Sequence, residues 1–224
     1  MHPTIARAGG VAGWTALVLI FGYHLAVQAV AGTRVSGTLD PSAISAYYHH
    51  EILAPASIAQ VIVLPVMLVF VLALRAAASR NGELPRFLAT VGAGLVIAEL
   101  AVLLTEVSIQ AALVTVASTG GDAVGMFRFW DVLYNSGTYV LEAGMLASFG
   151  LALRGDRAFP RWLPTFSLVA AALQLVNMTA IWVGIPDTAT MVGNVALAVW
   201  FGGSSVGLGR LAQTSRVVLA PQPA

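Results

Sequence analysis

The chain has no cysteine and no lysine among its 224 residues. Without cysteine it can form no disulfide, no iron–sulfur cluster and no thiol nucleophile. Without lysine it cannot hold retinal as a Schiff base. Only 9% of its residues are charged, whereas a soluble domain has about a quarter. The net charge of +1 gives no reason to expect a nucleic-acid partner.

Apolar residues take the place of charge: they make up 58% of the chain, and the mean hydropathy is +0.85. Six hydrophobic stretches are each long enough to cross a hydrocarbon core about 30 Å thick. They are residues 10–32, 53–75, 87–116, 129–153, 163–184 and 188–209. We therefore expect an all-α, polytopic membrane protein. Its bundle of six transmembrane helices would occupy residues 10–212, between a cytoplasmic segment of residues 1–9 and a disordered cytoplasmic tail of residues 213–224.

The placement of arginine predicts the orientation of this bundle. Arg34 and Arg128 lie on one side, and the other nine arginines lie on the opposite side. The nine are Arg7, Arg75, Arg80, Arg86, Arg154, Arg157, Arg161, Arg210 and Arg216. Since cytoplasmic loops are enriched in basic residues, both termini are expected in the cytoplasm. Arginine without lysine is typical of a GC-rich bacterial genome, so we expect a bacterial inner membrane, with the lipid bilayer as the surrounding partner.

Each stretch carries one uncharged-polar or ionisable residue at a similar depth. These residues are His24, Gln60, Glu99, Glu142, Asn177 and Asn194. Counted from the cytoplasmic ends at about 1.5 Å per residue, they lie roughly 16 to 22 Å into the hydrocarbon core. Polar groups at that depth cost several kcal/mol unless they face one another, water or a ligand. We therefore expect them to surround a cavity near the middle of the membrane.

Carboxyl groups concentrate on the third and fourth stretches. One stripe of the fourth, roughly 100° wide, contains Arg128, Asp131, Asn135, Thr138, Tyr139 and Glu142. Glu99 and Glu106 are seven residues apart on the third, which places them two turns apart on one face. In an antiparallel pair, Glu99 would lie beside Glu142 near mid-membrane. Nearer the outside, Arg128 could neutralise Asp131 or Glu106 in an ion pair that fixes the helix register.

The inner level, made by Glu99 and Glu142, has no basic partner. Two carboxylates in a low dielectric cannot both ionise cheaply, so one is expected to hold a proton. This level is either a proton-handling or cation-binding centre, or a neutral carboxyl group hydrogen-bonded to Gln174, Asn177 or a backbone carbonyl. His24 could add a third ligand for a divalent metal, but ligand type alone does not establish such a site. No metal or cofactor is predicted.

The longest connection, residues 33–52, contains Asp40 followed by Pro41, which predicts a short helix that caps the outer end of the bundle. Tryptophan is favoured where a membrane meets water. Four of the tryptophans are expected there, namely Trp14, Trp130, Trp162 and Trp182. The pattern of a rhomboid-type protease is absent, because Ser136 lacks a glycine two residues before it and the last stretch has no histidine base.

Four short pieces frame most of the chain. They are Ala-Arg-Ala-Gly-Gly at 6–10, Ile-Ala-Glu-Leu-Ala-Val-Leu-Leu at 97–104, Phe-Pro-Arg-Trp-Leu at 159–163 and Ala-Leu-Ala-Val-Trp at 196–200. With these pieces the chain resembles a bacterial family of six-helix integral membrane proteins that is classed only as a domain of unknown function. The Pro-Arg-Trp-Leu motif before the fifth stretch is the most specific of them. The resemblance implies a six-helix fold and an inner-membrane location.

Together these features predict a polar midplane cavity that binds or moves a small solute, an ion or a proton. A second interpretation is a non-catalytic membrane partner or sensor subunit, in which the polar layer specifies helix packing alone. A third is an enzyme on a lipid or isoprenoid substrate, with Glu99 or Glu142 as the acid or base. The sequence makes no prediction of the oligomeric state.

Overall fold

The computed structural model describes residues 1–31, 40–49, 53–119, 121, 123–182 and 188–219. Within these residues the protein is all-α and about 90% helical. The α-helices of this part are α1 (Pro3–Ala31), α2 (Pro41–Tyr48), α3 (Leu53–Ala78), α4 (Glu83–Ser118), α5 (Val124–Val132), α6 (Tyr139–Ala152), α7 (Leu163–Trp182) and α8 (Thr188–Leu219). A 3₁₀ turn, η1 (Ser79–Asn81), joins α3 to α4, and a π-helical segment, η2 (Leu133–Thr138), joins α5 to α6.

Four helical segments in the described part of the chain are long and apolar enough to cross a membrane. They are Pro3–Val27, Gln60–Asn81, Glu83–Ser118 and Val192–Ser215. Two shorter apolar segments are Tyr139–Ala152 and Leu163–Thr179. The first of these is short because η2 interrupts the α-helical pattern of the predicted fourth stretch. A π turn is not visible in a pattern read at 3.6 residues per turn, so sequence periodicity could not predict it.

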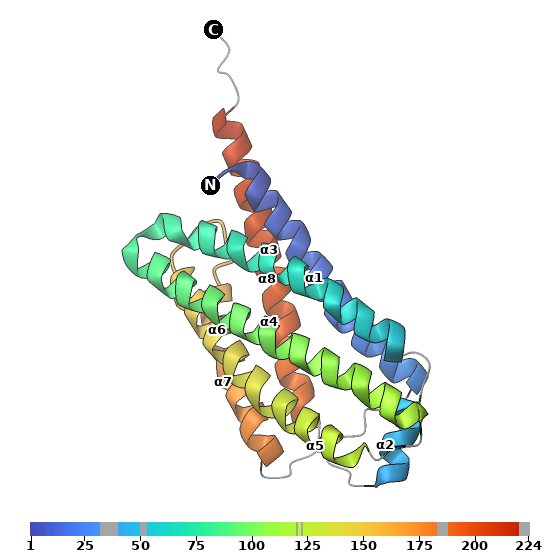
Figure 1. Ribbon diagram of the computed structural model, residues 1–224. Coiled ribbons are helices and arrows are strands. Elements are labelled where there is room, and N and C mark those ends of the chain that lie inside the picture. The colour runs from blue at the N-terminus through green and yellow to red at the C-terminus, as the bar shows by residue number, and fades with distance from the viewer. Residues whose placement is uncertain (32–39, 50–52, 120, 122, 183–187, 220–224) are drawn as a thin grey trace.

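The helices form a ring in chain order (Figure 1). α1 packs on α3, α3 on α4, α4 on α6, α6 on α7 and α7 on α8, and α8 closes the ring against α1. α5, η2 and α6 follow one another without a break and serve as one rod of this ring. The start of α1 and the end of α8 lie at the same end of the molecule (Figure 1).

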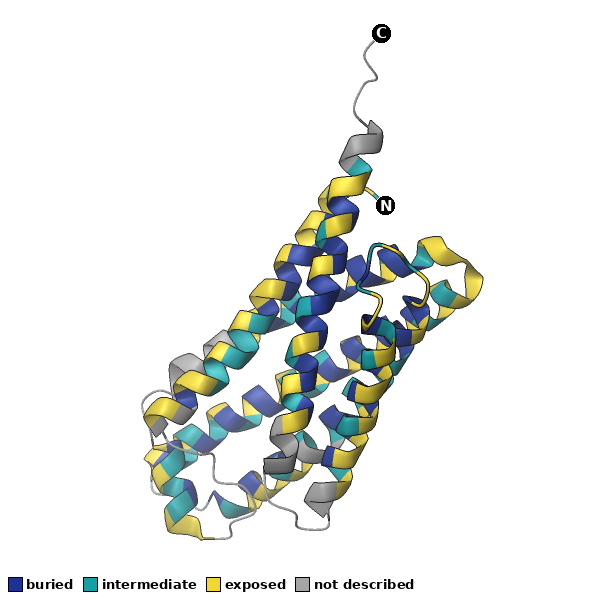
Figure 2. Ribbon diagram, turned by 180° about the vertical axis from the view of Figure 1, so that it is seen from behind, coloured by how far each residue is buried: buried dark blue, intermediate teal, exposed yellow. Residues whose placement is uncertain are grey.

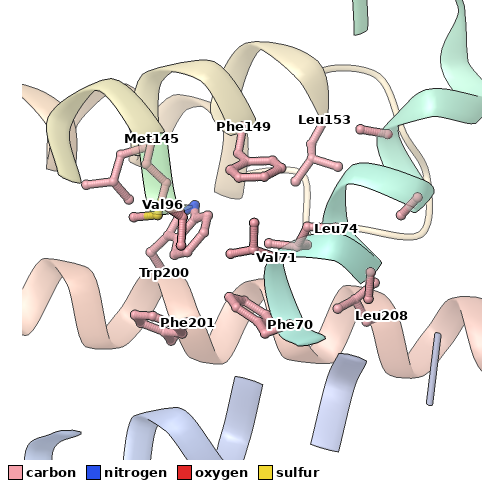
Figure 3. Close-up of a cluster of buried hydrophobic side chains, with 14 of the residues drawn as sticks. Phe70, Val71, Leu74, Val96, Met145, Phe149, Leu153, Trp200, Phe201 and Leu208 are labelled. Atoms are coloured by element: carbon pink, nitrogen blue, oxygen red, sulfur yellow. The ribbon is translucent and has the colours of Figure 1, made fainter. Parts of the chain in front are cut away.

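Large apolar side chains of α3, α4, α6 and α8 pack together inside the ring (Figure 3). Phe70 on α3 stacks on Phe201 on α8, with ring centroids 5.1 Å apart. Trp200 meets Phe70 edge-on at 5.8 Å and is fully buried. The outward faces of the rods are exposed (Figure 2), and they carry large apolar residues such as Ile97 and Val195. Apolar side chains on both the inner and outer faces are typical of helices surrounded by lipid.

The opposite end of the ring is covered by the short helix α2. Asp40 caps this helix, since its side chain accepts a hydrogen bond from the backbone N–H of Ser42 at 2.9 Å, and Pro41 follows in the first turn. The hydroxyl and N–H groups of Ser42 stabilise the charged carboxylate and lower the pKa of Asp40 below its usual 3.8. Ile44 and Tyr48 are fully buried in a second apolar cluster. The predicted short helix, with Pro41 at its start after Asp40, is confirmed.

Two arginine-containing turns, η1 and the turn between α6 and α7, contact each other, and the end of the bundle where they lie is called the arginine-rich end. Arg80 Nη2 and Asn81 Nδ2 on η1 donate to Asp156 Oδ2 in the α6–α7 turn, at 3.1 and 3.0 Å. Asp156 also accepts from the backbone N–H of Ala158 through Oδ1, at 3.0 Å. These bonds bring together two of the loops whose arginines were assigned to one side of the membrane.

The ends of the helical domain differ from the sequence-based boundaries. α1 begins at Pro3, before the span predicted from residue 10, and α8 continues to Leu219, past the position where a disordered tail was expected. Leu211 and Ala212 are buried, and the hydroxyl of Thr214 donates to the backbone carbonyl of Arg210 at 3.0 Å. The polar residues after Ala212 therefore continue the helix instead of ending it.

Candidate functional site

An internal cavity with a volume of about 120 Å³ lies inside the ring. Its lining residues come from α1, α3, α4, α8 and the rod made by α5, η2 and α6. A space of this size has room for several water molecules or a small solute. Its polar and ionisable lining residues are Tyr23, His24, Gln60, Glu99, Glu106, Gln110, Tyr134, Thr138, Tyr139, Glu142 and Asn194.

Five of the six residues of the predicted polar layer line this one cavity. They are His24, Gln60, Glu99, Glu142 and Asn194. Asn177, the sixth, is buried behind it on α7, where its Nδ2 donates to Gln174 Oε1 at 3.0 Å. Estimating depth from the helix ends therefore placed these residues at compatible levels on different helices.

The helix α4 supplies two carboxyl groups that are almost completely buried. Glu99 is 4% exposed and Glu106 is 3% exposed. Their separation of two helical turns corresponds to about 10 Å along the axis, and both line the cavity. The Oε2 atom of Glu99 is buried and has no hydrogen-bond partner among the described residues. Leaving such an atom unsatisfied costs about 1–3 kcal/mol or more, so it is a ready acceptor or donor for a molecule in the cavity.

The third carboxyl group, Glu142 on α6, is held from behind by α7. Gln174 donates from Nε2 to Glu142 Oε2 at 2.6 Å, and it accepts from Asn177 as described above. The backbone of Gly193 on α8 lies against these two amides, and a Cβ atom at this position would collide with Asn177 Nδ2 and with Gln174 Oε1. Gln174, Asn177 and a backbone carbonyl were the partners expected for a carboxyl group at the inner level. Of these, Gln174 is the one that bonds to Glu142.

Aromatic residues line the end of the cavity nearest to α2. The rings of Trp130 and Tyr134 are stacked, with centroids 5.6 Å apart. Nearby, Gln110 Nε2 on α4 donates to the hydroxyl of Tyr23 on α1 at 3.5 Å. Sequence reasoning did not assign these residues to the site. A signal was present for Gln110, which lies one turn after Glu106 on the same face of α4.

Trp130, one of the tryptophans expected near the membrane interface, is buried inside the bundle. Trp130 is 4% exposed and belongs to the buried cluster under α2, whereas Trp14 and Trp162 are both 47% exposed. The indole of Trp130 packs edge-on against the ring of Tyr48, with centroids 6.4 Å apart. A helix that folds over the end of a bundle buries an amphipathic residue that position along the chain would assign to the surface. The side chain of Trp182 lies outside the described residues.

The outer ion pair is not formed. Arg128 is exposed, and within the part of the chain that the structure describes no salt bridge joins it to Asp131 or Glu106. Arg128 and Asp131 share one helix face, but the long arginine side chain can reach solvent at the edge of the bundle, where an exposed ion pair contributes little. The side chain of Asn135 lies outside the described residues, although its backbone belongs to η2.

A divalent-metal site made by His24, Glu99 and Glu142 is not supported. No group of three histidine, aspartate or glutamate side chains lies close enough to hold a metal ion in the described ranges. The cavity is nevertheless acidic, because three glutamates and no arginine are among the described residues that line it. An arrangement of this kind can bind a cation, hold a proton or bind a polar solute.

No protein-family model, no curated protein and no solved structure matches this chain. The resemblance to the six-helix membrane family therefore stays a prediction.

Proposed function

We propose that this protein is a bacterial inner-membrane protein whose internal cavity binds or moves a small solute, an ion or a proton. The observation that supports this most strongly is the buried Glu99 Oε2 atom, which lines the cavity without a hydrogen-bond partner in the described residues. Polar networks that only specify packing satisfy their own members. A carboxyl oxygen left open toward a cavity is the arrangement expected of a binding site.

The alternative is that the polar residues only fix the packing of the helices. The bonds from Asn177 to Gln174 and from Gln174 to Glu142 favour it for that part of the layer, because each is a direct side-chain contact and both amides are buried. This alternative does not explain why the buried Glu99 Oε2 atom lines the cavity without a hydrogen-bond partner among the described residues. If the polar layer only specifies helix packing, as in the interpretation as a partner or sensor subunit, the cavity should bind no ligand, so the same binding experiment decides between the two.

All six rods of the ring are proposed to cross the membrane, with both termini in the cytoplasm. Besides the four long segments, α5, η2 and α6 together run from Val124 to Ala152, which is roughly 40 Å of helix. α7 lies between α6 and α8 in the same ring. The six-helix family resemblance and the arginine distribution favour the same arrangement.

A reporter experiment tests this topology. A reporter fused after Arg216 should report the cytoplasm, and one inserted at Gly120 should report the periplasm. The opposite result at either position would overturn the proposed orientation.

The binding function is tested by filling the cavity. Leu103 lines the cavity, and its neighbour Leu104 is 50% exposed on the outer face of α4. Purified protein would be melted with potassium, magnesium, tetramethylammonium or glycerol, and between roughly pH 5 and pH 8. At least one condition should raise the melting temperature in a saturable way, since a ligand that binds only the folded state stabilises it.

The variant Leu103→Phe should abolish that stabilisation, and Leu104→Phe should retain it. If no condition stabilises the wild-type protein, or if both variants respond like the wild type, the cavity is not a binding site and the proposal fails.

A further inference from the structure

We infer that the cavity selects a small organic ammonium ion, that is, a cation whose charge is carried by nitrogen and surrounded by methyl or methylene groups. This inference rests on the proposed function, because it names the ligand class for the same cavity. Four properties of the site support it: the sign of its charge, the spacing of its carboxyl groups, its aromatic end and its apolar walls.

The sign of the charge favours a cation. Glu99, Glu106 and Glu142 all line the cavity, and arginine is absent from the lining that the structure describes. Glu99 is 96% buried, and its Oε2 atom has no hydrogen-bond partner in the described part of the protein. A positive ligand would supply the missing partner and offset the cost of burying the carboxylate. An anion would find no compensating charge.

The spacing of the carboxyl groups favours an organic cation over a metal ion. A metal needs four to eight ligand atoms within about 2.0–2.6 Å. In the described residues no three acidic or histidine side chains converge in this way. The two carboxyl groups on α4 are about 10 Å apart along the helix. These two groups cannot converge on one metal ion, whereas an ammonium ion needs only one of them, Glu99, as its partner.

The aromatic end provides the second half of an ammonium site. Trp130 and Tyr134 present a stacked pair of rings at the cavity, and Tyr139 adds a third ring one turn further along the same rod. Cations surrounded by methyl groups bind to the faces of such rings. Apolar residues, among them Ile20, Met67 and Leu103, make up much of the remaining wall. They suit the alkyl body of the ligand and disfavour a strongly hydrated ion.

The test compares choline with its uncharged carbon isostere, 3,3-dimethylbutanol, which has the same shape without the positive charge. Binding is measured by isothermal titration calorimetry in dodecyl maltoside micelles, whose headgroup has neither charge nor an ammonium group. Choline should bind the wild-type protein at least about tenfold more tightly than the isostere, because the charge contact is partly desolvated. Potassium should bind more weakly than choline, since it gains little from the rings and the apolar wall.

Two matched pairs of variants assign the effect to the site. Glu99→Gln keeps the shape of the side chain and should weaken choline binding by about tenfold. Glu83→Gln removes a charge from an exposed position on the same helix and should leave binding unchanged. Tyr134→Leu removes a ring and should weaken binding several-fold, whereas Tyr134→Phe keeps the ring and should retain it.

Equal affinity for choline and the isostere, or tighter binding of potassium, would overturn the inference. If another member of the cavity-filling panel still bound in that case, the proposed function would survive without this ligand class. If no member of the panel bound, both the proposed function and the inferred ligand class would be wrong. The comparison of the two ligands uses the wild-type protein, so it holds even where Glu99→Gln does not fold.

Discussion

Gln174 on α7 donates a hydrogen bond to Glu142 on α6, with 2.6 Å between Nε2 and Oε2. None of the described side chains of α7 lines the cavity, yet α7 fixes one of the three carboxyl groups that do. Glu142 and Glu99 therefore differ in kind. Glu142 has a partner on the neighbouring helix, and the Oε2 atom of Glu99 has none among the described residues. Glu142 is therefore positioned by the fold, and the Oε2 atom of Glu99 is open to the cavity.

Replacing Gln174 with leucine should destabilise the protein. The change leaves Glu142 and Asn177 without their shared partner inside the bundle, and a lost buried partner costs about 1–3 kcal/mol. Gln213→Leu, at an exposed position on α8, is the matched control and should have little effect. The measurement is thermal unfolding in detergent. A double-mutant cycle with Glu142→Leu should show a non-additive interaction, and strictly additive losses would mean that the two residues do not interact.

Gly193→Ala should also destabilise the protein, because the new Cβ atom would overlap both amides of the α7 network. Overpacking at a well-packed position costs about 1–3 kcal/mol. Gly94 offers a control within α4, since a Cβ atom there would meet nothing within 4 Å. Gly94→Ala should be neutral or stabilising by roughly 0.5–1 kcal/mol, as expected for a helical glycine. Equal melting temperatures for the two variants would contradict the close approach at Gly193.

Much of the site could be predicted from the sequence because a helix converts residue number into depth. That relation predicted one common level for residues that are far apart in the chain. Five of them line the same cavity, namely His24, Gln60, Glu99, Glu142 and Asn194. Residue number does not predict which helices contact one another. Which helix faces which depends on the closure of the ring by α1 and α8, and no local pattern encodes this closure.

Each mismatch between the sequence-based expectations and the structure has its own physical cause. Trp130 is buried because α2 folds over it, and a contact between segments more than 80 residues apart has no local signature. The π segment η2 changes the turn that carries Tyr134 and Thr138, so the stripe drawn at 100° per residue does not hold there. Arg128 shows the limit of pairing charges by helix face, since a long side chain can leave the face on which its Cα lies.

Removing the charge of Arg128 should therefore have little effect on stability. The side chain is exposed and is not paired with Asp131, so Arg128→Gln should change the free energy of unfolding by less than about 0.5 kcal/mol. Arg80→Gln is the comparison, because Arg80 is in a salt bridge with Asp156. Thermal unfolding of both variants checks the prediction. A larger loss of stability for Arg128→Gln than for Arg80→Gln would support the ion pair that was expected from the sequence.

Asp156 should be a stability determinant at the arginine-rich end. Its two oxygens accept from Arg80, Asn81 and the backbone of Ala158, and its side chain is 7% exposed. Asp156→Ala removes all three bonds and should cost about 1–3 kcal/mol, since bonds to a charged acceptor are stronger than neutral ones. Glu83→Ala, an exposed acid at the start of α4, is the control. An equal effect of both changes would mean that the turns are held by other contacts.

The cap of α2 should depend on pH through Asp40. Ser42 holds the pKa of this carboxyl below its usual 3.8, so the charged form is favoured in the folded state. The stabilisation is present above the pKa of the unfolded chain, and it is lost as the pH falls through the lower pKa of the folded state. Protection of the α2 amides, measured by hydrogen exchange and corrected for the intrinsic rate, should therefore decrease below about pH 4. Asp40→Asn can still cap the helix but cannot titrate in this range, so its protection should not change with pH. A wild-type profile as flat as that of Asp40→Asn would show that the charge of Asp40 does not stabilise α2.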